Sequence, residues 1–239
     1  MNKYLFVFLA CIYSHTIAAQ HSTRHLNMLW VNYNNTVELN NKWLITSDVQ
    51  LRTRDWLRQW SLVALRTGAG YKINKQLTAI AGFTWFGNVR YVSDSAVISN
   101  EWRPWQEVTL SIHPGKGLLQ QRIRTEQRFL QKLIRTQHTQ AYEKRFRFRY
   151  RIEYAFAPLG KTIEVHVGNE TMVNMNYMGD DRFFDQNRTF LIVNYKTAAN
   201  TFIQFQYIKL IQWFGAVDLL EDQNVYRLSV HQLIKAHRH

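Results

Sequence analysis

In residues 145–156, charged side chains alternate with aromatic and aliphatic ones. The charged positions are Arg145, Arg147, Arg149, Arg151 and Glu153. A guanidinium group binds a carboxylate or another oxyanion through paired, parallel hydrogen bonds. This row of guanidinium groups could therefore bind anions from solution, or it could form ion pairs with carboxylates of the same protein.

This alternation predicts a β-strand, because successive side chains of a strand point to opposite faces. Ten further segments show the same period more weakly, and they are 29–39, 45–52, 60–71, 77–91, 102–112, 118–129, 162–173, 184–195, 201–210 and 226–234. Most of them have the roughly 9 to 11 residues with which a tilted strand crosses a bilayer. We therefore expect an all-β fold.

The connections between these segments are expected to alternate in length. The short ones contain turn residues and lie at 40–41, 74–75, 114–117, 158–160 and 199–200. The longer, polar ones lie at 53–59, 92–101, 130–143, 174–183 and 211–224. Short periplasmic turns and longer outer loops are typical of transmembrane up-and-down β-barrels, whose strand number is even in bacteria. We therefore expect 10 or 12 antiparallel strands, with the path of the first strand left open.

Turn chemistry also predicts cross-strand pairs. A type II′ turn in the Pro-Gly-Lys-Gly sequence, with a glycine at its first central position, places Glu107 opposite Arg124. The turn that follows the arginine-rich strand places Glu170 opposite Arg147 or Arg149.

The amino terminus has the features of a secretory signal. Asn2 and Lys3 precede an apolar core, and the small residues Ala18 and Ala19 favour cleavage after Ala19. We expect residues 1–19 to be a signal peptide and residues 20–239 to be a single domain. The only cysteine, Cys11, lies inside this signal, where a lipoprotein cleavage site is the alternative. No later apolar run reaches the roughly 20 residues of a membrane helix.

Alternation alone does not distinguish a membrane barrel from an exported soluble barrel. The chain has 8 Trp, 12 Tyr and 14 Phe, and several lie near predicted strand ends, where membrane interfaces collect aromatic rings. These are Trp30, Trp43, Trp60, Tyr71, Tyr91, Trp102, Tyr154 and Tyr195. They favour the bacterial outer membrane.

In a membrane barrel the arginines must face the lumen, because one Arg on the lipid face costs roughly 2 to 4 kcal/mol near the midplane. We therefore expect a network of luminal charges. Its predicted members are Glu107, Arg122, Arg124, Glu126, Arg128, Arg145, Arg147, Arg149, Arg151, Glu153, Glu164, Glu170 and Arg188.

The net charge of +13 would ordinarily raise nucleic acid as a partner, but export argues against nucleic acid. The expected partners are outer-membrane lipid and lipopolysaccharide, the barrel assembly machinery during insertion, and a small anionic solute. Two functions follow, a narrow anion-preferring channel and a structural barrel whose lumen is filled with charge. A lipid-modifying outer-membrane enzyme and an exported soluble binding protein remain the alternatives.

Other groups of residues give weaker indications of function. Ser229 and His231 share a strand face, but neighbours on one face lie about 7 Å apart, beyond direct contact. His166 is expected to point inward near Glu153. We predict no catalytic residue, no cofactor and no metal site. Three weaker groups are interpreted as a basic tail and solvated loop charges, namely His231 with His237 and His239, Asp180 with Asp181, and Glu221 with Asp222.

Across almost the whole of residues 30–233, the sequence resembles a family of uncharacterised bacterial outer-membrane proteins, the domain of unknown function numbered 2490. The resemblance is carried by spaced polar and aromatic positions, and these are Lys42-Trp43, Asp48, Gln50, Arg52, Trp105-Gln106-Glu107, Arg122, Arg124, Glu126, Arg128, Arg145 to Tyr150, Glu170 and Phe184 to Arg188. It implies an outer-membrane barrel and supplies neither a substrate nor functional residues.

Overall fold

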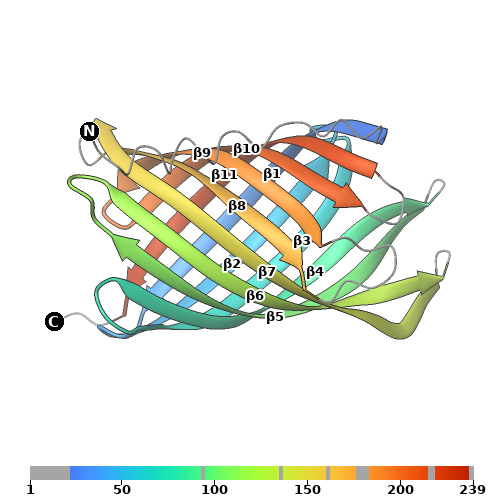
Figure 1. Ribbon diagram of the computed structural model, residues 1–239, viewed down its shortest axis with the longest axis horizontal. Helices are drawn as coiled ribbons and strands as arrows, with labels where there is room; N and C mark the ends of the chain where they lie inside the picture. The colour runs from blue at the N-terminus through green and yellow to red at the C-terminus, as the bar shows by residue number, and fades with distance from the viewer. Residues whose placement is uncertain are drawn as a thin grey trace.

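The computed structural model describes residues 22–92, 95–134, 137–159, 162–175, 183–214 and 219–236, and the predicted signal peptide lies outside them. The described residues form eleven strands, one for each segment expected from the sequence (Figure 1). The strands are β1 (Ser22–Glu38), β2 (Trp43–Arg54), β3 (Gln59–Lys72), β4 (Leu77–Val92), β5 (Ser95–Ile112), β6 (Leu118–Ile134), β7 (Gln137–Leu159), β8 (Ile163–Asn174), β9 (Phe184–Ala198), β10 (Thr201–Phe214) and β11 (Leu219–Lys235).

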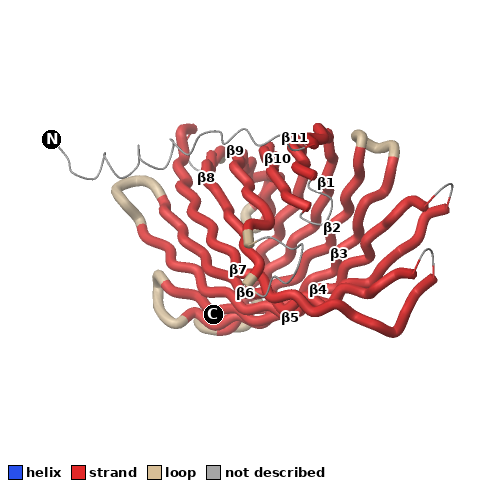
Figure 2. The backbone as a smooth tube through the Cα atoms, turned by 45° about the vertical axis from the view of Figure 1, so that its right-hand side comes forward, coloured by secondary structure: helices blue, strands red, loops and turns tan. Residues whose placement is uncertain are grey.

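The strands close into a barrel in which each strand pairs with its neighbours in sequence (Figure 2). All of these pairs are antiparallel, and closure is made by a parallel pair between β1 and β11, from Ser22 opposite Leu219 to Glu38 opposite Lys235. The expectation of 10 or 12 strands, all antiparallel, is therefore wrong. Eleven up-and-down strands leave the first and the last running in the same direction, so only a parallel ladder can satisfy both edges.

The barrel has two different ends. At the short-turn end, the connections after β1, β3, β5, β7 and β9 are brief, as expected. At the opposite, distal end, three of the five expected long loops are mostly strand. The strands on either side extend into them, with β4 ending at Val92 and β5 beginning at Ser95, β6 ending at Ile134 and β7 beginning at Gln137, and β10 ending at Phe214 and β11 beginning at Leu219. The β4–β5 and β6–β7 hairpins project beyond the other strands at this end (Figure 1). Polar residues that suggested loops extend these hairpins instead.

The predicted register is confirmed for one hairpin and wrong for the other. Gly115 has a φ of 64° and Glu107 lies opposite Arg124, as the type II′ turn requires. Glu170 instead lies opposite Arg151. The difference arises because β7 continues to Leu159 with an irregularity after Phe156, so that the turn comes later in the chain than expected.

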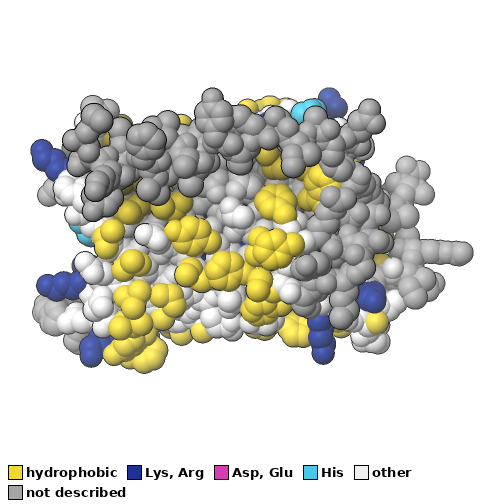
Figure 3. Space-filling model, viewed as in Figure 1, with side chains coloured by type: hydrophobic (Ala, Val, Ile, Leu, Met, Phe, Trp, Pro, Cys, Tyr) yellow, Lys and Arg dark blue, Asp and Glu magenta, His cyan; other side chains and the backbone are white. Residues whose placement is uncertain are grey.

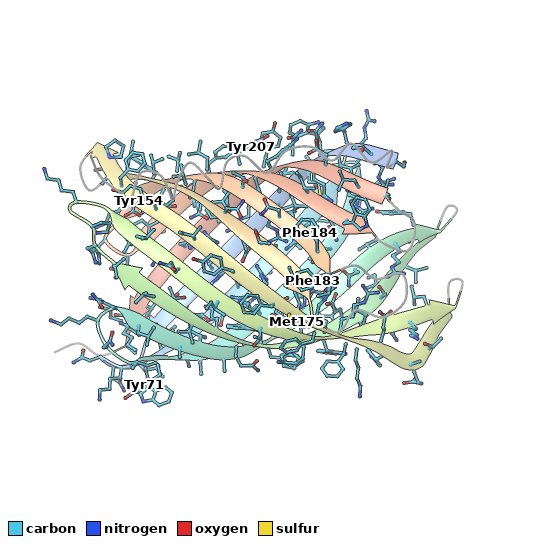
Figure 4. All side chains as sticks on the ribbon, viewed as in Figure 1. Tyr71, Tyr154, Met175, Phe183, Phe184 and Tyr207 are labelled. Atoms are coloured by element: carbon cyan, nitrogen blue, oxygen red, sulfur yellow. The ribbon has the colours of Figure 1, made fainter. Side chains whose placement is uncertain are left out.

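Large hydrophobic side chains cover much of the outer wall of the barrel between its ends, with hydrogen-bonded polar groups such as Gln106, Thr125 and Gln127 among them. Large hydrophobic side chains point outward along the strands, and Ile123 and Val108 are 48% and 43% exposed. Figure 3 shows hydrophobic side chains over the middle of one face, with Lys and Arg side chains toward both ends. Tyr71 and Tyr154 lie near the short-turn end of this wall, and Met175 lies where β8 ends (Figure 4). The described residues contain no helix that is long and apolar enough to cross a membrane.

The interior holds both charge and a small apolar core. The apolar core consists of Met28, Trp30, Phe190, Ile192, Ile208, Leu210 and Val225. Trp30 is 1% exposed, so its predicted place among the outward aromatic rings is wrong. The inward faces of β5 to β8 instead carry buried arginines and glutamates. The interior thus carries the charges of β5 to β8 on one side and, on the other, an apolar core among further polar and charged side chains.

Candidate functional site: the charged interior of the barrel

Glu126, on β6, is the carboxylate with the most guanidinium neighbours. It is 1% exposed, and its oxygens lie 2.5 Å from Arg149, 3.0 Å from Arg103 and 3.9 Å from both Arg147 and Arg124. One buried negative charge thus faces four positive charges. These arginines come from β5, β6 and β7, so the ion pairs connect three consecutive strands.

A second carboxylate, Glu170 on β8, continues the network. It lies 2.6 Å from Arg122, 2.8 Å from Arg149 and 3.6 Å from Arg188. Glu107 accepts a hydrogen bond from Arg124, with 2.5 Å between the Nη2 of Arg124 and the carboxylate oxygen. Because Arg149 contacts both Glu126 and Glu170, the network runs from β5 to β9 without a break.

Three members of the network were not predicted from the sequence. Glu101 lies 2.6 Å from Arg103 and 2.6 Å from Arg128, and Asp185 lies 2.8 Å from Arg147. Arg103 lies inside the strand predicted at 102–112, and Glu101 lies one residue before its start, so carrying the alternation one residue further would have placed both on the inward face. Asp185 follows the first residue of β9, where an alternating pattern is weakest.

The remaining predicted residues lie at the two ends of the network. Arg151 pairs with Glu153, which lies 2.5 Å from His166 as the sequence suggested. Glu164 is 2.8 Å from the other nitrogen of His166, and its side chain is 46% exposed. Arg145 pairs at 2.5 Å with Glu143 at the distal end. The structure therefore brings all thirteen predicted residues into ion pairs, with Arg145 and Glu164 at the margins.

Aromatic rings support several of the arginines. The Arg124 guanidinium lies 4.4 Å from the ring centre of Trp105, and the Arg151 guanidinium lies 4.3 Å from that of Phe190. Each ring lies against a glycine of the wall, since a Cβ at Gly82 would be 2.4 Å from Trp105 and one at Gly168 would be 2.6 Å from Phe190. Glycine allows the ring to lie flat, and the ring then attracts the cation above it.

A cavity of about 1070 Å³ occupies the distal half of the barrel. Among the described residues, 16 Arg or Lys and six Asp or Glu line it. Its lining reaches Asn34, Arg66, Arg122 and Arg227 and includes no residue nearer to the short-turn end of those strands. The described lining of this part of the interior is therefore strongly basic.

The residues weighed for catalysis or metal binding are arranged differently. The Ser229 hydroxyl is buried and has no hydrogen-bond partner among the described residues, while His231 Nε2 lies 3.2 Å from Asn34 and 3.3 Å from Gln204. Glu221 and Asp222 are in β11, not in a loop, and pair with Arg24 and with Lys209 respectively. The described residues contain no cluster suited to a metal ion, and His237, His239, Asp180 and Asp181 lie outside them.

Comparisons with known proteins identify a family for this chain. No curated protein matches the chain. A solved structure described as a NanC porin in a rhombohedral crystal form has 11% sequence identity and a TM-score of 0.47, covering 82% of this chain and 94% of that one. The family described as proteins of unknown function, DUF2490, matches residues 27–219. The chain belongs to the DUF2490 family.

Proposed function

We propose that this protein is an outer-membrane β-barrel of a bacterium and that its lumen forms a narrow pore that prefers anions. The observation that carries the proposal is the excess of basic side chains around the cavity, 16 against six acidic ones among the described residues. A ring of fixed positive charge in a narrow, low-dielectric passage attracts anions and repels cations. Small anions would enter from the distal end.

The outward distribution of apolar side chains supports the membrane location. Side chains such as Ile123, Val108 and Phe205 would contact lipid tails, while the charges stay enclosed. In this proposal lipopolysaccharide surrounds the distal half of the wall, and the barrel assembly machinery inserts the chain after cleavage of the signal peptide at residue 19. Neither nucleic acid nor a cofactor has a role, and the barrel does no chemistry.

One observation favours a second candidate, a structural barrel without conduction. The lining of the cavity ends about halfway along the strands, and the short-turn half contains the buried side chains of Trp105, Leu44 and His166. A lumen filled in this way stiffens the barrel. The two candidates differ in one measurable property, the passage of ions.

Reconstitution into planar bilayers under asymmetric KCl tests the proposal. We expect small, discrete conductance steps and a reversal potential displaced toward that of chloride. Replacing Arg52 and Arg227 with Gln removes two luminal charges that have no carboxylate within 4.0 Å among the described residues, and it should lower the anion preference. Arg58→Gln, in an exposed connection outside the cavity, is the matched control and should leave the preference unchanged. Absent conductance, or a preference for cations, would exclude the pore.

A further inference from the structure

Three luminal arginines are oriented by glutamines and not by carboxylates. Arg52 donates to the Gln50 side-chain oxygen at 2.9 and 2.5 Å, Arg188 donates to Gln186 at 2.8 Å, and Arg227 donates to Gln204 at 3.3 Å. We call these six residues the arginine–glutamine cluster. An amide oxygen fixes the direction of a guanidinium group but leaves its positive charge uncompensated.

The same local geometry occurs with glutamate on the other side of the lumen. Arg103 donates to Glu101, two residues before it on the same strand, as Arg52 does to Gln50 and Arg188 does to Gln186. The difference is therefore chemical and not geometric. Among the described residues Arg52 and Arg227 have no carboxylate within 4.0 Å, and the carboxylate nearest to Arg188 is Glu170 at 3.6 Å, which is shared with two other arginines.

The arginines of the cluster lie close enough to repel one another. Repulsion from Arg188 and Arg227 acts on Arg52, and Arg66 adds to it although it pairs with Asp48 at 3.1 Å. The Arg52 guanidinium lies 3.7 Å from the ring centre of Trp30, and that of Arg188 lies 5.6 Å from the same centre. Stacking on one indole brings these two charges together, and burial strengthens their repulsion. A bound anion would relieve it.

The cluster also has buried donors without acceptors. The Nε groups of Arg188 and Arg227 and the indole nitrogen of Trp30 have no hydrogen-bond partner among the described residues. Buried donors in proteins are almost always paired, so such a group indicates a missing acceptor. Arg52, Arg188, Arg227 and Trp30 all line the cavity that opens at the distal end, and a small solute could therefore reach them.

We propose that the arginine–glutamine cluster is a binding site for a small, multiply charged oxyanion with the chemistry of phosphate or of a short dicarboxylate. Guanidinium groups donate two parallel hydrogen bonds to such oxygens. Two charges without a carboxylate within 4.0 Å among the described residues, beside the Arg188 charge that shares Glu170 with two other arginines, favour a divalent anion over chloride. The site lies in the inner part of the cavity, where Arg188 and Arg227 are the lining residues of β9 and β11 nearest to the short-turn end. This inference rests on the proposed function only for the entry of solutes into the lumen.

Calorimetric titration of the purified barrel in detergent tests the site, with inorganic phosphate, sulfate, succinate and chloride as separate ligands. We expect one strong site per chain for a divalent anion and much weaker binding of chloride. The phosphate and succinate titrations distinguish the two oxyanion chemistries. Binding no tighter for any divalent anion than for chloride would overturn the proposal.

The decisive variants keep every arginine and give its acceptor a negative charge, and Gln50→Glu also removes the hydrogen bond that the Gln50 amide donates to Asn32 at 3.0 Å. Gln50→Glu and Gln186→Glu should preserve the orientation of Arg52 and Arg188 and raise the Kd by about tenfold or more, which corresponds to ~1.4 kcal/mol. Gln212→Glu, which adds the same charge to the cavity lining near the distal end of β10, should change the Kd much less. Circular dichroism and a heat-dependent shift in gel mobility would establish that each variant is folded. Equal effects from all three substitutions would also overturn the site.

The titration tests the binding site and the conductance experiment tests the pore, so either proposal can be overturned without the other. Divalent anion binding without conductance would support the site and exclude the pore. Anion-preferring conductance without divalent binding would support the pore and exclude the site. A Trp30→Phe variant adds a spectroscopic control, because the fluorescence change on binding should be reduced if the ligand lies beside the indole that Arg52 covers.

Discussion

At Glu126 a single buried carboxylate is shared by guanidinium groups from three strands. Removing one partner of a buried ion pair leaves the others desolvated without compensation, at a cost of about 3 to 5 kcal/mol. We therefore expect Glu126→Gln to lower the free energy of unfolding by roughly that amount. Urea unfolding in detergent, followed by tryptophan fluorescence, measures it.

Glu143→Gln is the matched control for this substitution. Glu143 likewise forms an ion pair with an arginine, Arg145, but its side chain is 39% exposed. Exposed ion pairs contribute below about 1 kcal/mol, so the control should unfold close to the parent protein. Similar losses in the free energy of unfolding for the two variants would mean that the interior is as well hydrated as the rim. Glu126 would then contribute no more to stability than an exposed carboxylate does.

The sequence predicts the members of this network better than it predicts their partners. Alternation puts Arg147, Arg149 and Glu170 on one face without any knowledge of the fold. It does not determine that Glu170 contacts Arg149 and Arg122, because these contacts depend on a register that is set by where β7 ends and β8 begins. It also assigned Trp30 to the outer wall, since an aromatic ring in an alternating strand suits either side.

Gly68 in β3 and Gly82 in β4 leave room in the interior for the large ring of Trp105. A Cβ at Gly82 would lie 2.3 Å from the Thr67 carbonyl oxygen and 2.4 Å from Trp105. Neither contact can be relieved by a flexible side-chain end, because one involves backbone and the other a 2%-exposed indole. Gly82→Ala should therefore cost about 1 to 3 kcal/mol through overpacking.

Gly87→Ala, on the same strand, gives the comparison. Its added Cβ would meet only the side chains of Trp85 and Ile98, at 3.1 Å or more. Thermal unfolding should show a clear loss for the first variant and a small change for the second. If Gly87→Ala destabilises as much as Gly82→Ala, loss of the glycine itself and not the displacement of Trp105 is responsible.

The parallel pairing of β1 with β11, which closes the barrel, could not be predicted from the sequence. All eleven strands were located from periodicity, but a count of strands gives no information on how the first and last ones meet. A rule that bacterial barrels have even strand numbers then gave the wrong total. The structure pairs Asn27 with Asn224 and Asn35 with Gln232 along this seam.

Cysteine pairs test the direction of the seam. The barrel domain contains no natural cysteine, because the single one is Cys11. We expect Asn27→Cys with Asn224→Cys, and Asn35→Cys with Gln232→Cys, to form disulfides under mild oxidation, since paired positions lie within disulfide range. The exchanged pairs, Asn27 with Gln232 and Asn35 with Asn224, would join only if the two strands were antiparallel. Mass spectrometry of unreduced peptides distinguishes the two arrangements.

For the molecule as a whole, the positions of polar and apolar side chains indicate the surroundings that suit the fold. Charged side chains line the interior, and large hydrophobic side chains are exposed on the outer wall. Periodicity separates two faces of each strand but cannot state which face meets water. The closed barrel resolves this, because the face with Arg122 and Arg124 is enclosed and the face with Ile123 is exposed. An apolar wall around a charged interior is stable where the wall contacts hydrocarbon.

A single arginine moved from the inside to the outside of β6 tests this environment. Ile123 is 48% exposed between two luminal arginines, near the middle of the wall. In a bilayer, Ile123→Arg should cost roughly 2 to 4 kcal/mol and reduce the fraction of chains that insert. Ile73→Arg, at a 51%-exposed position in the β3–β4 turn, should have little effect because its guanidinium can reach water. Folding yields into lipid vesicles, measured by protease protection, compare the two. A soluble barrel would tolerate both substitutions equally and become more soluble, so equal yields would place the wall in water and not in lipid.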